Sequence, residues 1–381
     1  MECEMSAGRA RTDGSPDLIL LLSTLVLVCL GTVMVYSSSF IIASERFGDE
    51  YYFLKKQIVF VFIGLFVMIG LSRFPYRYWE KLAYPGIILS CFLLILLTLP
   101  GFGTTVGGAT RWLKVGPLTF QVSEVVKVAV VIFMAYYLTK KLDHLKEFLR
   151  IFLMPLMLTS VIVVLILMQP DFGTAVIIIL AVLCMFLVAG GRLIHLAGLG
   201  AACVPLAIFL IVRESYRLKR IMAFRSPWDD PSNSGYQIIQ SFISFGSGGT
   251  FGVGLGNSMQ KLFYLPEPHT DFIFAVLAEE GGFITVAAVI ALFCLLIARG
   301  FMISFQADTV FGILLASGLT TLLALQVFVN MAVVMGLIPT KGLALPFISY
   351  GGTSLVVNMA AIGILINIAS SRKRTGRGGK P

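Results

Sequence analysis

Three ionisable side chains lie within five positions of one another in the segment 264–274, which reads Tyr-Leu-Pro-Glu-Pro-His-Thr-Asp-Phe-Ile-Phe. They are Glu267, His269 and Asp271, in a chain of which only 13% is charged. Asp271 opens an apolar stretch, where a carboxylate is costly unless it is used. Such a carboxylate can take a proton in a reaction, because burial and neighbouring groups can raise its pKa toward the working pH. We therefore place the chemistry of this chain at Asp271.

The elements that must position these residues are membrane helices. The 381-residue chain is 57% hydrophobic and has a mean hydropathy of +0.92, which is more apolar area than a soluble fold can hide. Apolar runs recur along it, each long enough to span a bilayer as a helix. We expect an all-α polytopic membrane protein with about ten transmembrane helices near 17–43, 54–72, 83–100, 117–138, 148–169, 172–191, 193–212, 272–298, 309–338 and 349–371.

Lys and Arg residues near the helix ends set the expected orientation. Sixteen of them fall on the side that holds both termini, against six in the short segments of the other side. We therefore expect a cytoplasmic tail over 1–16, a membrane domain over 17–371 and a basic cytoplasmic tail over 372–381. The large loop 213–271, between the seventh and eighth helices, then lies outside the cytoplasm. Its apolar residues predict short amphipathic helices against the bilayer.

The net charge of +9 does not indicate nucleic-acid binding. The basic residues Arg372, Lys373 and Arg374 directly follow a helix, where Lys and Arg ordinarily attract anionic membrane lipids. None of the six cysteines lies in an external loop, so no disulfide framework follows. The Gly-rich part 246–256 lacks the Gly-Lys-Ser/Thr ending of a phosphate loop, and we interpret it as flexible backbone beside the lipid.

Further charged residues precede and enter the fourth expected helix. Arg111, Trp112 and Lys114 lie in the loop before it. The two cations can bind a phosphate or, with equal weight, anchor the loop at the membrane interface. Glu124 and Lys127 are three residues apart and share a helix face. We expect them to form a structural ion pair, because pairing relieves the cost of each charge in the membrane.

Other acidic residues have structural interpretations. Asp171 follows Pro170 at a helix break and is expected to cap the next helix, as Asp does at helix starts. Glu279 and Glu280 lie inside the eighth helix. For one of them we prefer an ion pair with a cation such as Lys341 over a role facing a catalytic cavity.

Five motifs occur in order along the chain. They are Arg111-Trp-Leu with Phe120-Gln-Val-Ser-Glu-Val-Val-Lys127, Gln169-Pro-Asp-Phe-Gly-Thr174, Gly246-Ser-Gly-Gly249, Pro266-Glu-Pro-His-Thr-Asp-Phe-Ile-Phe274 and Pro346-Phe-Ile-Ser-Tyr-Gly-Gly-Thr-Ser354. By these motifs the chain resembles the SEDS family of bacterial shape, elongation, division and sporulation proteins. The likeness runs from about residue 17 to 371, and the segments 220–231 and 256–264 are more similar to division members than to elongation members. Val122 stands where the family usually has Pro.

The resemblance implies a ten-helix peptidoglycan glycosyltransferase in the bacterial cytoplasmic (inner) membrane. Such an enzyme polymerises lipid II outside the cytoplasm, with a class B penicillin-binding protein as its transpeptidase partner and other division proteins around it. By the same resemblance, the essential carboxylate falls on Asp271 and the structural ion pair on Glu124 and Lys127.

In that reaction a sugar hydroxyl of one lipid II attacks the anomeric carbon of another and expels undecaprenyl pyrophosphate. Asp271 is then the expected general base, with His269 assisting or orienting it. Protein cations, or a divalent cation such as Mg²⁺ or Mn²⁺ held by Asp271 and Glu267, would stabilise the leaving group. The candidate substrate-binding residues are Arg111, Trp112, Lys114, Arg217, Lys261, Glu267 and His269.

Two rival functions fit part of the pattern. A lipid flippase or transporter would also use a ten-helix bundle with intramembrane charges and helix breaks at Pro170 and Pro339. A noncatalytic division scaffold would need no carboxylate, so replacing Asp271 would have no effect. The flippase would depend more on Glu124 and Lys127 than on Asp271, whereas the polymerase would lose activity through Asp271 alone.

Overall fold

The computed structural model describes residues 17–99, 103–106, 109–115, 118–141, 148–191, 193–233, 235–261 and 268–371. Both predicted tails, 1–16 and 372–381, and Glu267 lie outside these residues. Ten helices of the described part follow the ten predicted apolar runs. They are α1 (Leu18–Phe47), α2 (Tyr52–Arg73), α3 (Trp79–Thr98), α4 (Val122–Lys141), α5 (Phe148–Met168), α6 (Phe172–Val188), α7 (Leu193–Arg213), α10 (Ile273–Phe305), α11 (Val310–Val334) and α12 (Gly352–Ser370).

Most of these helices have the length and composition of membrane spans. Seven of the described helices are long and apolar enough to cross a bilayer, namely α1, α2, α4, α10, α11, α12 and α3 with the short 3-10 helix Tyr76–Tyr78 before it. The helices α5, α6 and α7 occupy the other three predicted runs. The prediction of a polytopic helical membrane protein with about ten spans is confirmed.

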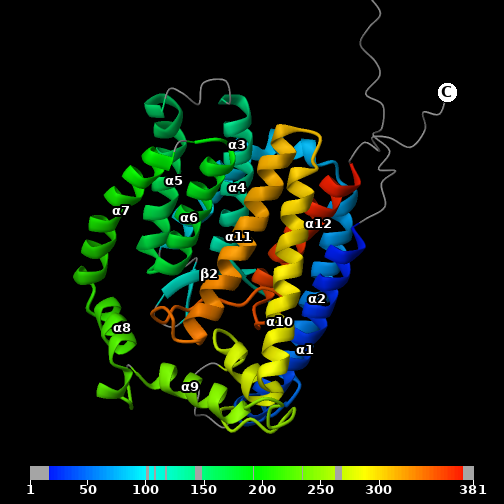
Figure 1. Cartoon of the computed structure of the whole chain (residues 1–381), viewed down its shortest axis with the longest axis vertical. Coiled ribbons are helices and arrows are strands. Elements are labelled where there is room, and N and C mark those ends of the chain that lie inside the picture. Colours follow the sequence, from blue (N-terminus) through cyan, green and yellow to red (C-terminus); the bar gives the residue numbers. More distant parts are fainter. Residues whose placement is uncertain are drawn as a thin grey trace, which may run out of the picture.

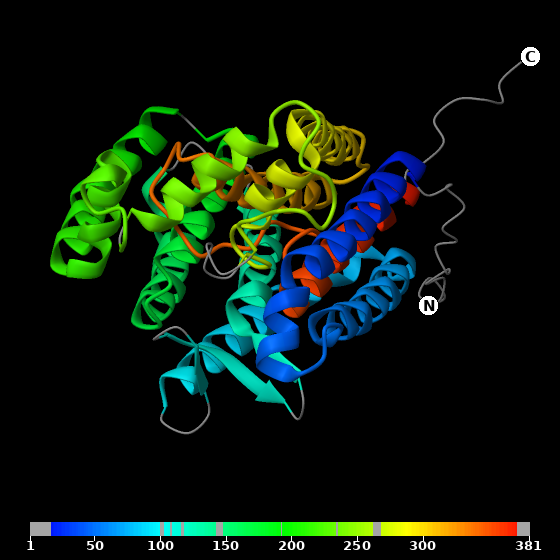
Figure 2. The ribbon, with the colours of Figure 1, turned by 90° about the horizontal axis from the view of Figure 1, so that it is seen from below.

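The helices form one bundle, with its most buried members in the middle. In α4, α11 and α12, 72%, 78% and 78% of the residues in the apolar window are buried, against 17% in α2. Helices α1, α2 and α12 make up one side of the bundle and α5 to α7 the other (Figures 1 and 2). The start of α10 lies toward the lower end of Figure 1, opposite the turn between α10 and α11.

Short polar side chains cap the starts of several helices, and a glycine ends α1. The Asp17 carboxylate accepts a hydrogen bond from the Leu20 amide at 3.0 Å and caps α1, which ends at Gly48 in a left-handed conformation. The Thr309 hydroxyl caps α11 through the Gly312 amide. Asp171 accepts from the Thr174 amide at 3.1 Å, so its predicted role as a cap of α6 is confirmed.

A small antiparallel sheet departs from the all-α prediction. Its strands are β1 (Gly103–Val106), β2 (Ala109–Val115) and β3 (Leu118–Gln121), in the order β1-β2-β3. This stretch is rich in Thr, Val and aromatic residues, which favour strands. The fourth helix therefore begins at Val122 rather than near 117, because residues 118–121 pair with β2 instead of extending the helix.

The large loop between α7 and α10 contains the predicted short helices. They are α8 (Ser215–Arg225), the 3-10 helix Pro227–Asp229 and α9 (Tyr236–Gly248). Figure 1 shows α8 and α9 at the same lower end of the bundle as the start of α10. The helices in this loop are confirmed.

The Gly-rich part of this loop is not flexible backbone, as the sequence had suggested, but is hydrogen-bonded to α10. The Val253 amide donates to the Glu279 carbonyl at 3.0 Å, and the Phe283 amide donates to the Gly249 carbonyl at 2.9 Å. This contact occurs where α10 is kinked at Gly282, whose φ is 66°. A Cβ on Gly252, whose φ is 80°, would lie 2.1 Å from the Glu280 carbonyl oxygen. Glycine is needed here because the two backbones approach so closely.

Candidate functional site

Asp271 lies two residues before α10 and is half-buried. Its backbone carbonyl accepts a hydrogen bond from the Asn330 side-chain amide of α11 at 3.0 Å. The same amide nitrogen donates to the Leu343 carbonyl at 2.6 Å. Asn330 therefore joins the start of α10 to the segment between α11 and α12. Because α11 is central in the bundle, this link fixes Asp271 to the most buried part of the fold.

The segment between α11 and α12 packs directly against the Asp271 carboxylate. A Cβ on Gly342 would lie 3.0 Å from the Asp271 Oδ2. Lys341 is the preceding residue and is half-buried, and burial lowers the pKa of its ammonium group. Among the described residues, no carboxylate lies within ion-pair distance of Lys341. The partly dehydrated Lys341 ammonium thus belongs to the residue next to Gly342, whose backbone packs against the Asp271 carboxylate.

The first turn of α6 completes this region. The Lys341 Nζ lies 5.1 Å and the Arg217 guanidinium carbon 5.3 Å from the centre of the Phe172 ring. A Cβ on Gly173 would be in contact with the Leu343 side chain at 3.3 Å. Arg217 comes from α8, and Lys341 comes from the segment between α11 and α12. Cations from two distant parts of the sequence therefore meet at one aromatic ring. Together with Asp271, they form a half-buried region of one carboxylate and two cations, called here the Asp271 region.

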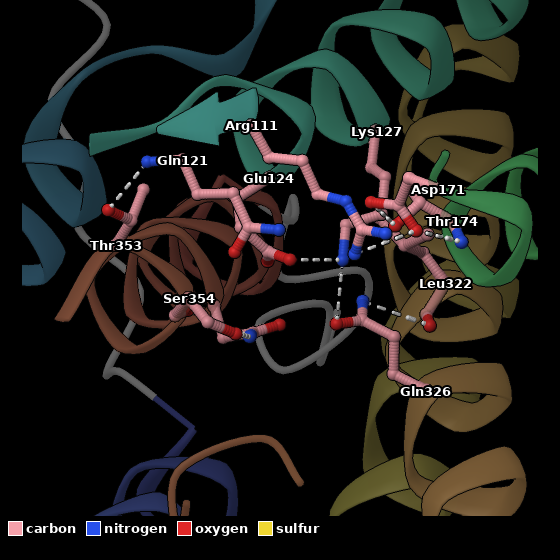
Figure 3. Close-up of polar contacts among 11 residues, drawn as sticks. Arg111, Gln121, Glu124, Lys127, Asp171, Thr174, Leu322, Gln326, Thr353 and Ser354 are labelled. Atoms are coloured by element: carbon pink, nitrogen blue, oxygen red, sulfur yellow. Dashed lines mark hydrogen bonds and ion pairs between the residues drawn. The ribbon is translucent and has the colours of Figure 1, made fainter. Parts of the chain in front are cut away.

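Arg111 is used in the link between α5 and α6. From β2 its guanidinium donates to the Gln169 carbonyl at 3.1 Å and the Pro170 carbonyl at 2.5 Å. The same group lies 3.8 Å from an oxygen of the Asp171 carboxylate (Figure 3). Arg111 therefore holds the sheet against the helix break. These contacts partly compensate the positive charge of Arg111 within the protein. Its main role is therefore to position the sheet against the helix break.

Glu124 and Lys127 form an ion pair in the interior. Their side chains meet at 2.8 Å, and Lys127 also donates to the Gln326 side-chain oxygen of α11 at 3.0 Å (Figure 3). Lys127 is 2% and Glu124 7% exposed. At such burial each charge depends on the other. Through Gln326, the pair joins α4 to α11.

The remaining predicted cations differ in their surroundings. Lys261 is 3% exposed and lies 3.1 Å from the Glu280 carboxylate. Glu280 therefore forms the predicted structural ion pair, but its partner is Lys261 rather than Lys341. Lys114 is exposed on β2, and Trp112 lies half-buried on the same strand, opposite Gln121 of β3.

The comparisons with known proteins agree on one family. The family model described as "Cell cycle protein" (FtsW, RodA and SpoVE) matches residues 17–374. The chain belongs to the FtsW/RodA/SpoVE family. It is 47% identical over 358 residues to a protein of Geobacter sulfurreducens named "Probable peptidoglycan glycosyltransferase FtsW". That alignment covers 94% of this chain and 96% of the relative. It is 41% identical over 355 residues to the stage V sporulation protein E of Bacillus subtilis, with coverage of 93% and 97%.

Solved structures with the same fold are similar to this chain. One, described as "Structural coordination of polymerization and crosslinking by a peptidoglycan synthase complex", is 31% identical with a TM-score of 0.78 and covers 94% of this chain and 99% of that one. The rod shape determining protein RodA of Thermus thermophilus is 28% identical with a TM-score of 0.69, covering 94% and 98%. The resemblance to the SEDS proteins is thereby confirmed.

His269 is a buried, neutral ring in this member of the family. Its ring centre lies 4.5 Å from that of Phe53 and 5.6 Å from that of Tyr350, and its carbonyl accepts from the Tyr350 amide at 2.9 Å. Burial, followed by the positive charge of Arg46, lowers the pKa of His269 to about 4. A neutral ring at pH 7 does not attract phosphate as a cation. The predicted role of His269 in binding substrate charge therefore does not fit this environment, and its role in assisting or orienting Asp271 stays a prediction.

Acid should weaken the fold through His269. In the unfolded chain a histidine has a pKa of about 6.5, so between pH 6.5 and pH 4 the unfolded state binds the proton and the folded state does not. Stability therefore falls as the pH falls through this window, by up to about 3 kcal/mol, and is fully present above it. We expect thermal unfolding midpoints in detergent to fall more between pH 7 and pH 4 for the wild type than for His269→Phe, which keeps an aromatic ring. Parallel pH profiles would contradict this assignment.

No metal site can be built from the described residues alone. Among them, no three His, Cys, Asp or Glu side chains lie close enough to hold a metal ion. The predicted second carboxylate, Glu267, lies outside the described residues. The described donors around Asp271 therefore do not fit a divalent cation site by themselves.

Lys341 in the Asp271 region and Asn330 beside it were not predicted from the sequence in their present roles. Lys341 had been assigned only as an ion-pair partner, and Asn330 had not been singled out. A lysine in the short polar segment Pro339-Thr-Lys-Gly342 between two apolar runs was the available signal for the first. An Asn inside an apolar helix, which needs a polar partner, was the signal for the second.

Proposed function

We propose that this chain is a peptidoglycan glycosyltransferase that polymerises lipid II into glycan strands on the outer face of the cytoplasmic membrane during cell division. The observation that carries the proposal is the Asp271 region, where one carboxylate lies against the Gly342 backbone beside two cations. Relatives named as peptidoglycan glycosyltransferases at 47% identity support the activity. Their FtsW name supports the division role over elongation.

Asp271 acts as the general base of the transfer. Its carboxylate takes the proton from the attacking sugar hydroxyl of one lipid II. The hydroxyl oxygen forms a bond to the anomeric carbon of the other, and the bond from that carbon to the pyrophosphate oxygen breaks. The electron pair leaves with undecaprenyl pyrophosphate. A fixed base is effective because its position next to the reacting hydroxyl costs no reordering during the reaction.

Lys341 and Arg217 stabilise the pyrophosphate as its charge grows. A partly dehydrated ammonium binds phosphate oxygens more strongly than a fully solvated one, because the local dielectric constant is lower. Lys341 replaces Lys261 in this role, since the Lys261 ammonium is already paired with Glu280. Arg111 contributes through the position of the α6 start, and Lys114 with Trp112 can guide the lipid headgroup toward it. A divalent cation that neutralises the pyrophosphate stays a prediction.

The proposal includes an orientation in the membrane. The short basic turns carrying Arg73, Arg77 and Lys141 belong to the end of the bundle opposite α8, α9 and the sheet (Figure 1). The positive-inside rule then favours cytoplasmic termini and an external Asp271 region. A class B penicillin-binding protein is the proposed transpeptidase partner, which the similarity to a solved peptidoglycan synthase complex supports. Other division proteins would join this pair.

The test is lipid II polymerisation by the purified full chain with its penicillin-binding partner, comparing wild type, Lys341→Met and Lys341→Arg. We expect glycan from the wild type and a kcat/KM for lipid II about 10- to 100-fold lower for Lys341→Met, because a charge-assisted contact to phosphate is lost. Lys341→Arg keeps the charge and should retain more activity. Equal kcat/KM in all three would contradict the role of Lys341.

The same preparation separates the rival functions. Movement of labelled lipid II across proteoliposomes without polymer would favour a flippase. Neither movement nor polymer, with a known polymerase active in the same assay, would favour a scaffold. Polymer from the wild type excludes both as the sole function.

A further inference from the structure

A buried ion pair between Lys261 and Glu280 attaches the end of the Gly-rich loop to α10. Glu280 lies in α10 and its side chain is fully buried, and so is nearly all of Lys261. Their charged groups meet at 3.1 Å. Among the described residues Lys261 has only one other charged or aromatic contact, the Phe40 ring of α1, whose centre lies 4.9 Å from its Nζ. Substrate binding does not explain why the charges of Lys261 and Glu280 are buried together.

Helix α1 supports the pair from the other side. The Ser37 hydroxyl contacts both oxygens of the Glu280 carboxylate, at 2.8 and 2.6 Å. Ser37 and Phe40 are three residues apart in α1 and share a face, so one face of α1 holds both members of the pair. Together, Ser37, Phe40, Lys261 and Glu280 are called here the latch. The latch joins α1, α10 and the end of the Gly-rich loop.

The carboxylate of the neighbouring Glu279 also attaches the end of the Gly-rich loop to α10. Its carboxylate accepts a hydrogen bond from the Met259 amide at 3.1 Å and another from the Ser258 hydroxyl. Glu279 is 2% exposed. The segment 258–261 is therefore attached to α10 through two consecutive glutamates. This attachment lies about two helical turns into α10, since Glu279 follows Asp271 by eight residues.

The chain that leaves the latch returns to the start of the same helix. Lys261 precedes Asp271 by ten positions. At the return, the His269 carbonyl accepts from the Tyr350 amide at 2.9 Å, and the Asp271 carbonyl accepts from Asn330. The connection thus begins and ends on α10, with the latch at one end and Asp271 at the other.

We propose that Lys261 and Glu280 are positioning residues that hold the Asp271 segment in its reactive place. This proposal rests on the proposed function for its effect on catalysis, but its structural part does not. If the latch opens, residues 258–261 lose their charged attachment to α10, and Lys261 no longer anchors the chain ten positions before Asp271. The contact between His269 and Tyr350 then opens more often, and Asp271 spends less time beside the sugar hydroxyl. Turnover falls, whereas lipid II binding through Lys341 and Arg217 is kept.

The experiment compares the wild type with Ser37→Ala, Lys261→Met/Glu280→Gln and Lys219→Met in the full chain with its partner. The double variant removes both charges, so no buried charge is left unpaired. Ser37→Ala keeps both charges and removes only a hydroxyl, which makes it the milder variant. Lys219→Met is the matched control, since Lys219 is an exposed lysine of the same large loop. Two readouts are taken: kcat and KM for lipid II, and hydrogen exchange of the peptide that contains the Tyr350 amide.

We expect the double variant to lower kcat at least about 10-fold with KM changed less than about threefold, because a 1 Å misplacement of a reacting group can cost about 100-fold in rate. We expect the Tyr350 amide to exchange faster in the double variant, faster to a smaller degree in Ser37→Ala, and unchanged in Lys219→Met. Wild-type exchange at Tyr350 in both latch variants overturns the proposal. So does faster exchange with wild-type kcat, because the latch would then be structural only. If the wild type itself made no glycan, the proposed function would fail, whereas the exchange experiment would still decide whether the latch holds the segment.

Discussion

The Asp271→Asn variant is expected to polymerise lipid II about 100- to 10,000-fold more slowly than the wild type, the range that a general base typically contributes. The amide has nearly the shape of the carboxylate but does not accept a proton. The main-chain bond to Asn330 does not involve the side chain, so the fold should persist. The measurement is the initial rate of glycan formation at saturating lipid II, with the complex yield and thermal unfolding midpoint matched.

A second carboxylate of this chain gives the control. Asp49 lies in the turn between α1 and α2, where its contacts with Lys55 are exposed. Asp49→Asn removes the same charge and should keep wild-type activity. Polymer at the wild-type rate from Asp271→Asn would remove Asp271 from the mechanism and return weight to the flippase and scaffold interpretations.

The second large effect is expected on stability, from Lys127→Met. Removing one member of a buried ion pair costs about 3–5 kcal/mol, because the other charge is left without a partner. The Glu124 carboxylate would lose the ammonium partner that lies 2.8 Å away, and the Gln326 oxygen would lose the donor that Lys127 provides. Glu124→Gln should cost less, since Lys127 can still donate to Gln326 and to the new amide. The measurement is the thermal unfolding midpoint in a constant detergent.

The double variant and a surface lysine test the cause. Glu124→Gln/Lys127→Met should be more stable than Lys127→Met alone, because no unpaired charge remains inside. Lys141→Met makes the same substitution at the exposed end of α4 and should change the midpoint little. If Lys127→Met were as stable as Lys141→Met, the pair would contribute nothing to the fold.

The helices were predictable because the membrane leaves few alternatives. An apolar run must satisfy its backbone internally, so its length and composition nearly determine a helix. The predicted run 54–72 and the observed Tyr52–Arg73 agree for this reason. The sheet was not predicted, since a Thr-rich loop between two helices reads equally as irregular backbone until its strands are seen to pair. The boundary of α4 moved with it.

The site was predictable in its centre and less so in its surroundings. Asp271 could be singled out because a carboxylate at the start of an apolar run is unusual. The partners of each lysine could not be assigned from the sequence, because Lys261 and Glu280 are brought together by a loop that turns back on its own helix. Sequence reasoning therefore gave Lys341 the partner that belongs to Lys261. Ion pairs across long separations follow from the fold rather than from spacing.

The attachment of the sheet to the helices has a consequence for the surroundings in which the protein works. Thr353 at the start of α12 accepts from the Gln121 amide at 3.1 Å, and Arg111 reaches the break before α6, so β2 and β3 are fixed at two sides. Lys127, a few residues beyond β3, is 2% exposed. At 0.1 M ionic strength, dissolved ions largely screen interactions between exposed charges that lie more than about 10 Å apart, but they screen buried pairs much less. The interior charges are thus insulated from the salt concentration of the surrounding solution, while the exposed Lys114 is not.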